Sequence, residues 1–121
     1  AQANEDLVRK YYTAYLRGVR DYCQAYHGGA NRVEMIELAL HSGAETRREL
    51  LTEYPWPARS PDGRVNIESV LDMQRWYTKN KFSTAQVPVS RLIDTSYIDY
   101  AVKKLGPFVL ENKDSKLSGC R

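Results

Sequence analysis

The stretch 61–77, PDGRVNIESVLDMQRWY, constrains the fold most, because it joins a turn to the start of an amphipathic helix. In the preceding SPDG sequence at 60–63, proline presets φ and glycine permits a positive φ, so we predict a sharp turn. Asn66 suits a helix N-cap, and the residues after it recur with the spacing of one helical face. That face consists of Ile67, Val70, Leu71, Gln74 and Tyr77, with Met73 and Trp76 on one flank. We therefore predict a helix over 66–80 that lies on a core.

The same combination of apolar spacing, caps and stops predicts four other helices, at approximately 5–27, 32–42, 46–54 and 95–105. Asn31 and Thr46 each begin a capping-box pattern, and Asp94 or Thr95 suits the N-cap of the last helix. No set of alternating segments predicts a sheet. We therefore predict a mainly α-helical chain of about five helices. Residues 1–110 form one helical subdomain in this interpretation, and the polar segment 111–121 is a flexible tail.

The first predicted helix is rich in tyrosine. Its apolar side has spacings of four and three residues and comprises Val8, Tyr12, Tyr15, Val19, Tyr22 and Tyr26. The other side carries Arg9, Lys10, Thr13, Arg17, Arg20 and Gln24. Tyrosine favours boundaries between packed elements and water, because its ring is apolar and its hydroxyl needs a partner. The face could therefore be the rim of a core or a surface that contacts a partner.

The charge pattern argues against nucleic acid as a partner. The net charge of +3 comes from 18 basic and 15 acidic residues that are interspersed along the chain. Residues 32–54 could form a helix-turn-helix, but the second helix would carry Glu45, Glu49 and Glu53 against only Arg47 and Arg48. Since a recognition helix must approach phosphates, those acidic groups would repel DNA, and we expect no nucleic-acid partner.

No residue pattern points to catalysis. His27 and His41 fall at the ends of predicted helices, where the helix dipole favours histidine. No serine or cysteine lies in a recognisable nucleophile motif, and no glycine-rich phosphate loop occurs. The aspartates fit turn, surface and cap positions rather than a carboxylate pair or metal site, namely Asp62, Asp72, Asp94 and Asp99. We therefore expect no enzyme activity, no catalytic residue, no metal and no cofactor.

The chain has two cysteines, Cys23 and Cys120, and neither belongs to a CxxC motif or a Cys/His cluster. A zinc site is therefore not predicted. Cys23 lies inside the first predicted helix and suits a buried, small apolar position, whereas Cys120 lies in the polar tail. The two could form a disulfide in an oxidising compartment, but one pair of cysteines does not establish that they are connected.

Three stretches in the same order and spacing resemble the C-terminal part of a family of transport proteins. They are LVRKYYTAYLRGVRDYCQAY at 7–26, PDGRVNIESVLDMQRWY at 61–77 and LIDTSYIDYAVKKLG at 92–106. The family is the periplasmic substrate-binding proteins of ABC importers, of the nitrate/sulfonate/taurine and THI5-like group. The resemblance covers roughly residues 4–107, and none of the three stretches is a catalytic signature. One departure is Asn80-Lys81-Phe82, where the family usually has a glycine.

This resemblance implies part of a two-lobed, type II periplasmic-binding fold in a periplasmic or extracytoplasmic location. The implied partners are a missing N-terminal lobe of the same protein, an ABC permease and a small anionic or heteroaromatic solute. The family's ligand-contacting loops precede anything present here, so no ligand-binding residue is carried over. We therefore expect a truncated helical subdomain that binds no solute strongly alone and that self-associates through uncovered apolar surface. The alternative is a free-standing helical interaction module that docks partners on its tyrosine-rich face.

Overall fold

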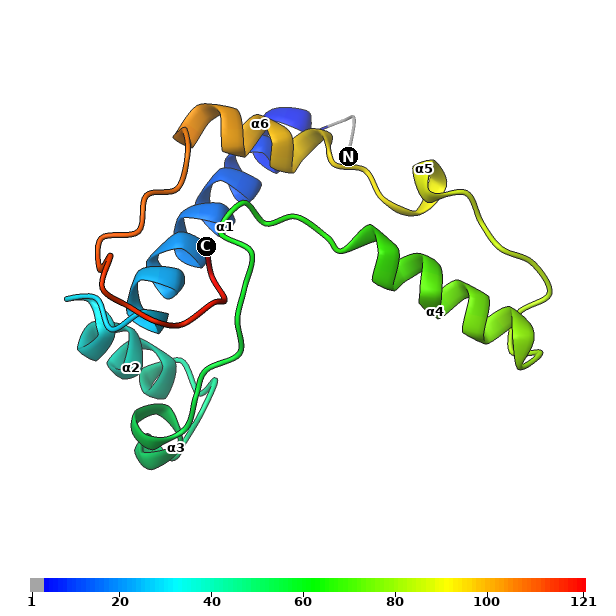
Figure 1. Ribbon diagram of the computed structural model, residues 1–121. Helices are drawn as coiled ribbons and strands as arrows, with labels where there is room; N and C mark the ends of the chain where they lie inside the picture. The colour runs from blue at the N-terminus through cyan, green and yellow to red at the C-terminus, as the bar shows by residue number, and fades with distance from the viewer. Residues whose placement is uncertain (1–3) are drawn as a thin grey trace.

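The computed structural model describes residues 4–121, and within them it contains six α-helices and no β-strand (Figure 1). The helices are α1 (Glu5–Tyr26), α2 (Arg32–His41), α3 (Arg48–Glu53), α4 (Ile67–Lys79), α5 (Val89–Leu92) and α6 (Ser96–Leu105). The predicted mainly α-helical class is confirmed, and the four-residue α5 is an addition that the sequence analysis did not predict. None of the helices in this part of the chain is both long and apolar enough to cross a membrane.

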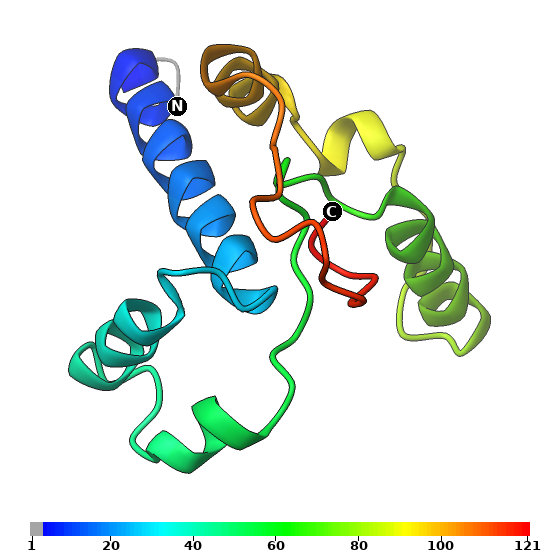
Figure 2. The same cartoon turned by 60° about the vertical axis from the view of Figure 1, so that its left-hand side comes forward.

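The core lies where α6 packs against α1 (Figures 1 and 2). Its buried residues are Leu16 from α1 and Ile98 and Ala101 from α6. Three partly buried side chains surround them, namely Tyr12, Val102 and Leu105. The i, i+3, i+4 spacing on α6 that predicted a buried face is therefore confirmed.

The face assigned to α1 from the sequence is only partly correct. Thr13 was predicted on the polar side but is buried, and its hydroxyl donates a 2.7 Å hydrogen bond to the carbonyl oxygen of Arg9. Tyr15 was predicted on the apolar side but is 50% exposed. The reason is that α2, α6, the 61–63 turn and the C-terminal segment contact α1 on different sides. A single apolar stripe cannot describe a helix that is surrounded in this way.

Helices α2 and α3 form a second layer at the C-terminal end of α1 (Figure 1). Arg32 joins α2 to α1 and to the segment after α3. Its guanidinium donates a 2.9 Å hydrogen bond to the carbonyl oxygen of Ala25 and lies 4.3 Å from the centre of the Trp56 ring. The Trp56 indole donates a 2.8 Å hydrogen bond to Leu51 in α3. This pairing of a guanidinium with an aromatic face fixes the segment that leaves α3.

The predicted helix boundaries are confirmed at some caps and wrong at others. Asn66 caps α4 as predicted, since its side-chain oxygen accepts a 3.1 Å hydrogen bond from the Ser69 N–H. The capping box at Thr46 is wrong, because α3 begins at Arg48 and no side chain caps it. The Glu45 carboxylate instead accepts the N–H groups of Thr46 and Arg47, at 2.8 and 3.0 Å.

Residues 66–93 form an arm that extends from the 61–63 turn, and Figures 1 and 2 show it apart from α1, α2 and α3. Helix α4 has no buried residue and no extensive packing against another helix in residues 4–121. The arm is held by its own contacts. The side chain of Gln74 exchanges two hydrogen bonds with the Val87 backbone, at 2.8 and 3.0 Å, and the rings of Trp76 and Phe82 stack 5.6 Å apart.

The C-terminal segment 107–121 runs back along α1 instead of extending away from it (Figure 1). Gln24 on α1 bonds the backbone at Val109 and Glu111, at 2.8 and 3.0 Å. Asn112 donates a 2.7 Å hydrogen bond to the carbonyl oxygen of His27. The flexibility predicted for residues 111–121 remains a prediction, but this path places the C-terminal residues beside the last turn of α1.

Candidate functional site

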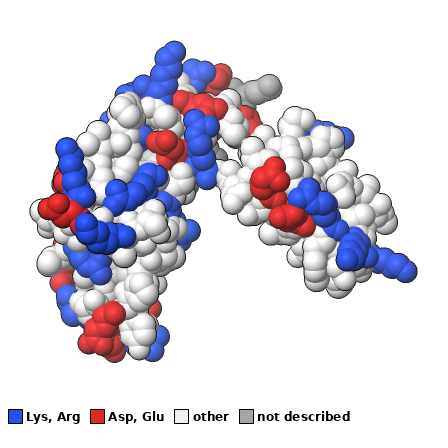
Figure 3. All heavy atoms as spheres, in the orientation of Figure 1, with Lys and Arg blue, Asp and Glu red and all other residues white. Residues whose placement is uncertain are grey.

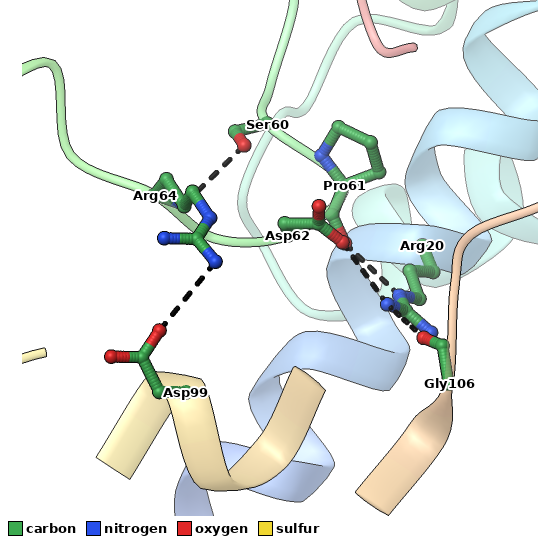
Figure 4. Close-up of polar contacts among 7 residues, drawn as sticks. All are labelled: Arg20, Ser60, Pro61, Asp62, Arg64, Asp99 and Gly106. Atoms are coloured by element: carbon green, nitrogen blue, oxygen red, sulfur yellow. Dashed lines mark hydrogen bonds and ion pairs between the residues drawn. The ribbon is translucent and has the colours of Figure 1, made fainter. Parts of the chain in front are cut away.

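Arg20 on α1 makes polar contacts with residues from two other segments of the chain (Figure 4). Its guanidinium donates hydrogen bonds to the carbonyl oxygens of Pro61 and Gly106, at 3.0 and 2.8 Å. It also pairs with the Asp62 carboxylate at 3.1 Å, and only 12% of the Arg20 side chain is exposed. The planar, five-donor guanidinium suits this role because it can bind several acceptors at fixed angles.

The turn beside Arg20 has the geometry that the sequence predicted. The Gly63 N–H donates a 2.8 Å hydrogen bond to the Ser60 carbonyl, and Gly63 has a φ of +63°. A Cβ at this glycine would lie 2.7 Å from the Ile98 side chain, so the turn presses directly on the core. Arg64 adds an ion pair to Asp99 on α6 at 3.6 Å (Figure 4).

The three stretches 7–26, 61–77 and 92–106 therefore meet at one junction. Arg20 comes from the first, Pro61 and Asp62 from the second, and Gly106 from the third. All the partners of Arg20 named here are internal, so the junction serves to connect helices and offers no free charge to a ligand. Sequence reasoning missed Arg20, because it stands among other basic residues on the polar side of its helix.

An open groove runs along α1 and is lined mostly by apolar groups. It has a volume of ≈ 540 Å³ and is lined by Ala14, Tyr15, Gly18, Val19, Tyr22, Met35 and Arg59. A neighbouring hollow of ≈ 300 Å³ lies between α2, α3 and Trp56 and shares Tyr22, Met35 and Arg59 with it. Tyr22 is part of the scaffold, because its hydroxyl donates a 2.7 Å hydrogen bond to Pro57 and its ring stacks on Trp56 at 5.3 Å. Tyr15 makes no such hydrogen bond within residues 4–121, so its side chain is less constrained than that of Tyr22.

The arm carries the largest group of exposed apolar side chains on one element. These are Ile67, Met73, Trp76, Tyr77, Phe82, Val87 and Leu92, which are 38–70% exposed. A hollow of ≈ 300 Å³ between α4 and α5 is lined mostly by apolar groups, including Val70, Met73 and Tyr77. Figure 3 shows the arm as a largely uncharged surface crossed by one band of charged side chains. Such a surface is typical of a site that another protein surface covers.

The histidines have structural positions. His27 follows α1 and is buried, with Nδ1 2.7 Å from the Ser115 hydroxyl and Nε2 2.8 Å from the Gly119 carbonyl oxygen. Since a carbonyl only accepts, Nε2 carries a hydrogen and donates it to Gly119, while Nδ1 forms a hydrogen bond with the Ser115 hydroxyl. His41 is the exposed last residue of α2. The two imidazoles are therefore separate, and His27 connects α1 to the C-terminal segment.

The aspartates singled out in the sequence remain dispersed. Asp62 pairs with Arg20, Asp72 with Arg75, and Asp99 with Arg64, while Asp94 accepts the Ser96 N–H at 2.9 Å near the start of α6. The Ser96 hydroxyl and then this backbone hydrogen bond lower the pKa of Asp94. Residues 4–121 contain no group of three or more histidine, cysteine, aspartate or glutamate side chains that could hold a metal ion.

The structure brings the two cysteines together. Both are free thiols, and both are buried, at 0% and 3% exposure for Cys23 and Cys120. The backbone of Arg59 contacts both sulfur atoms: its carbonyl oxygen lies 3.7 Å from the Cys23 sulfur, and its N–H donates to the Cys120 sulfur at 3.2 Å. Burial, together with a hydrogen bond to the Cys120 thiol, raises the pKa of Cys23.

Comparison of this chain with protein-family models, with curated proteins and with solved structures gave no match.

Proposed function

We propose that this chain is a helical subdomain of an ABC-importer solute-binding protein, which docks its apolar arm on another part of that protein. In this role the whole protein delivers a small anionic or heteroaromatic solute to a permease in an extracytoplasmic compartment. The observation that carries the proposal is the arm at residues 66–93. It combines a folded backbone with apolar side chains that remain 38–70% exposed.

The convergence of the three resembling stretches at Arg20 also supports this assignment. The resemblance rests on the order and spacing of the three stretches in the sequence and does not depend on contacts between them. In the structure, the first stretch supplies Arg20, and the other two stretches supply the groups that lie within 3.1 Å of its guanidinium. Three stretches that meet at one residue form a structural unit, as expected for a subdomain that fixes how its helices are joined.

Absence of a recognisable chemical centre in residues 4–121 agrees with a subdomain that supports a binding site formed elsewhere. A solute site needs convergent polar groups in a concave, mostly enclosed pocket. The hollows described above are open, and the Tyr22 hydroxyl, which lines two of them, is already paired internally. A solute held only by this chain would therefore be incompletely enclosed.

Isothermal titration calorimetry with nitrate, taurine, alkanesulfonates and pyrimidine precursors tests the proposal. The isolated chain should give no heat of tight binding with any of these compounds. Sub-micromolar affinity for one of them would show a complete site within the chain and would overturn the subdomain proposal.

A complementation experiment provides the positive test. We expect this chain, added to the N-terminal lobe of a taurine- or nitrate-binding protein that lacks its C-terminal helices, to form a complex by sedimentation. Met73→Glu with Trp76→Glu should abolish the complex, whereas Leu7→Glu, an equally exposed apolar position on α1, should not. Complexes that are insensitive to the arm variants would contradict the assigned docking surface.

A second candidate is a free-standing interaction module that uses the α1 groove. Tyr15 favours it, since half of this side chain is exposed at the edge of the groove. Pull-down of partners with Tyr15→Ala would separate the two functions, because that substitution removes a groove residue without touching the arm. Tyr22→Ala is less informative, because it also removes the hydrogen bond to Pro57 and the stack on Trp56.

A further inference from the structure

Cys23 and Cys120 are far apart in the sequence and adjacent in the fold. Cys23 lies in the last turns of α1, and Cys120 is the penultimate residue. The peptide group of Arg59 contacts both sulfurs, through its carbonyl oxygen at Cys23 and through its N–H at Cys120. Both side chains are buried, so solvent does not separate them.

The segment around Cys120 is positioned by contacts that are independent of its sulfur. His27 binds the Gly119 and Cys120 carbonyl oxygens at 2.8 and 3.3 Å and the Ser115 hydroxyl at 2.7 Å. Cys120 has a φ of +58°, a left-handed conformation that is unusual for any residue other than glycine. A conformation of this kind persists only where the surrounding contacts determine it, and here those contacts hold the thiol against Cys23.

We propose that Cys23 and Cys120 form an intramolecular disulfide that fastens the C-terminal segment 107–121 to α1. The oxidant is a disulfide, either glutathione disulfide or the disulfide of a thiol oxidoreductase. The two cysteines lose two protons and two electrons as the S–S bond forms, and the oxidant's disulfide gains them and leaves as two thiols. This reaction does not depend on the importer assignment, because it rests only on the contact between the two cysteines.

The order of the two exchange steps follows from where the cysteines lie. Cys120 lies in the segment 107–121, which hydrogen bonds to Gln24 and His27 hold on α1, so it becomes accessible when those bonds open and the segment lifts from α1. Its thiolate attacks the oxidant and releases one thiol, which leaves a mixed disulfide on Cys120. When the segment returns to α1, the Cys23 thiol loses its proton to solvent and attacks the Cys120 sulfur, expelling the second thiol.

The consequence is a redox-dependent attachment of the C-terminal segment. In the reduced protein, hydrogen bonds to Gln24 and His27 hold this segment. In the oxidised protein, the bond between Cys23 and Cys120 holds the same segment covalently and prevents it from leaving α1. The surface that it covers on α1 then stays covered even when the hydrogen bonds fluctuate.

The test is thiol quantification in glutathione redox buffers. Reduced wild-type protein is equilibrated at a series of glutathione disulfide concentrations, quenched with acid, alkylated with N-ethylmaleimide and weighed by intact mass spectrometry. The folded protein should become lighter by two hydrogen atoms, carry no maleimide and remain a single chain. Half-oxidation should require about a hundredfold less glutathione disulfide in buffer than in concentrated urea, because folding raises the effective concentration of the two thiols.

The matched control moves one sulfur by three positions. The double variant Cys120→Ser with Leu117→Cys retains two cysteines but places the second one at an exposed position. It should need at least about tenfold more glutathione disulfide than the wild type and give mainly glutathione adducts. Helical circular dichroism confirms that the variant is folded. The proposal is overturned if folded wild type keeps both thiols, if only interchain disulfides form, or if this control oxidises as readily.

Discussion

The Arg20 guanidinium donates a 2.8 Å hydrogen bond to the carbonyl oxygen of Gly106, the residue that ends α6. Gly106 is the C-cap of α6 and has a φ of +75°, which favours glycine. Its carbonyl oxygen points toward α1. Eighty-six residues separate the two partners in the sequence. One side chain on α1 therefore binds the end of α6 and the start of the C-terminal segment's return along α1.

Arg20→Met should lower the free energy of unfolding by about 2–3 kcal/mol, because it leaves the Pro61 and Gly106 carbonyls and Asp62 without their donor. Arg17→Met is the matched control on the same helix, since Arg17 is exposed and has no side-chain hydrogen bond or ion pair within residues 4–121. Urea unfolding followed by circular dichroism measures both. Equal effects of the two substitutions would show that Arg20 contributes only as a general surface cation.

Two glycine-to-alanine substitutions should change stability in opposite directions. Gly63→Ala should destabilise the fold by about 1–2 kcal/mol, because the residue has a positive φ and the new methyl group meets Ile98. Gly18→Ala should stabilise it by about 0.5–1 kcal/mol, because Gly18 lies inside α1 with open space around it and alanine favours helix. Thermal unfolding of the two variants gives the signs. A stable Gly63→Ala protein would contradict the turn geometry.

Local structure was predictable from the sequence where one residue and its near neighbours decide it. Asn66 caps α4 because its oxygen needs only the Ser69 N–H three residues later. The 60–63 turn needs only its own proline and glycine. Asn31 failed as a cap because its amide instead donates to the Asp21 carbonyl oxygen on α1, a partner that the local pattern does not contain.

The candidate sites were less predictable, because their partners are remote in sequence. In the sequence Arg20 resembles an exposed basic residue, because its partners Pro61, Asp62 and Gly106 reach it only in the folded chain. Cys120 lies in a polar segment without periodicity, so nothing local indicates that it returns to Cys23. The exposed face of the arm had a clear signal in its amphipathic spacing, but spacing alone cannot tell whether the covering surface belongs to the same chain.

Self-association should depend on the arm. Phe82→Glu with Met73→Glu should reduce any dimer or larger species seen by sedimentation velocity at low micromolar concentration, because both side chains are more than half exposed on one apolar surface. Leu7→Glu is the control, since Leu7 is 65% exposed but lies on α1. A strictly monomeric wild type would contradict self-association, and equal reduction by all variants would contradict the role of the arm.

The reduced protein should lose stability at alkaline pH. Burial raises the pKa of Cys23 and of Tyr22, so the folded state keeps protons that the unfolded chain releases. Below the ordinary thiol pKa of about 8.5, both groups are protonated in the folded and in the unfolded state, so they leave the free energy of unfolding unchanged there. As pH rises beyond that value, Cys23 alone should lower it by up to about 1.4 kcal/mol per pH unit.

Urea unfolding in reductant between pH 7 and 11 measures this loss. Cys23→Ala should flatten the profile just above the thiol pKa, and Tyr22→Phe should flatten it at higher pH. The other titratable or charged groups that influence these two are Tyr26, Arg59 and Cys120. A profile that is the same in wild type and Cys23→Ala would show that the unfolded and folded thiols release their protons alike.

Oxidation should stabilise the fold substantially, because the proposed disulfide closes a loop of roughly a hundred residues. In the chain-entropy model such a loop removes enough freedom from the unfolded chain to contribute about 5 kcal/mol. The gain should be close to this value, since both sulfurs already lie against the peptide group of Arg59 and their union demands little movement of α1 or the C-terminal segment.

Urea midpoints of the oxidised and reduced wild type, measured at pH 7, give the difference directly. Cys120→Ser treated with the same oxidant should show no gain, which separates the crosslink from other effects of oxidation. Hydrogen exchange should also slow at the backbone of residues 107–120 in the oxidised protein, because the segment can no longer leave α1 as a whole. An oxidised wild type with an unchanged midpoint would mean that bond formation strains the native contacts as much as it restrains the unfolded chain.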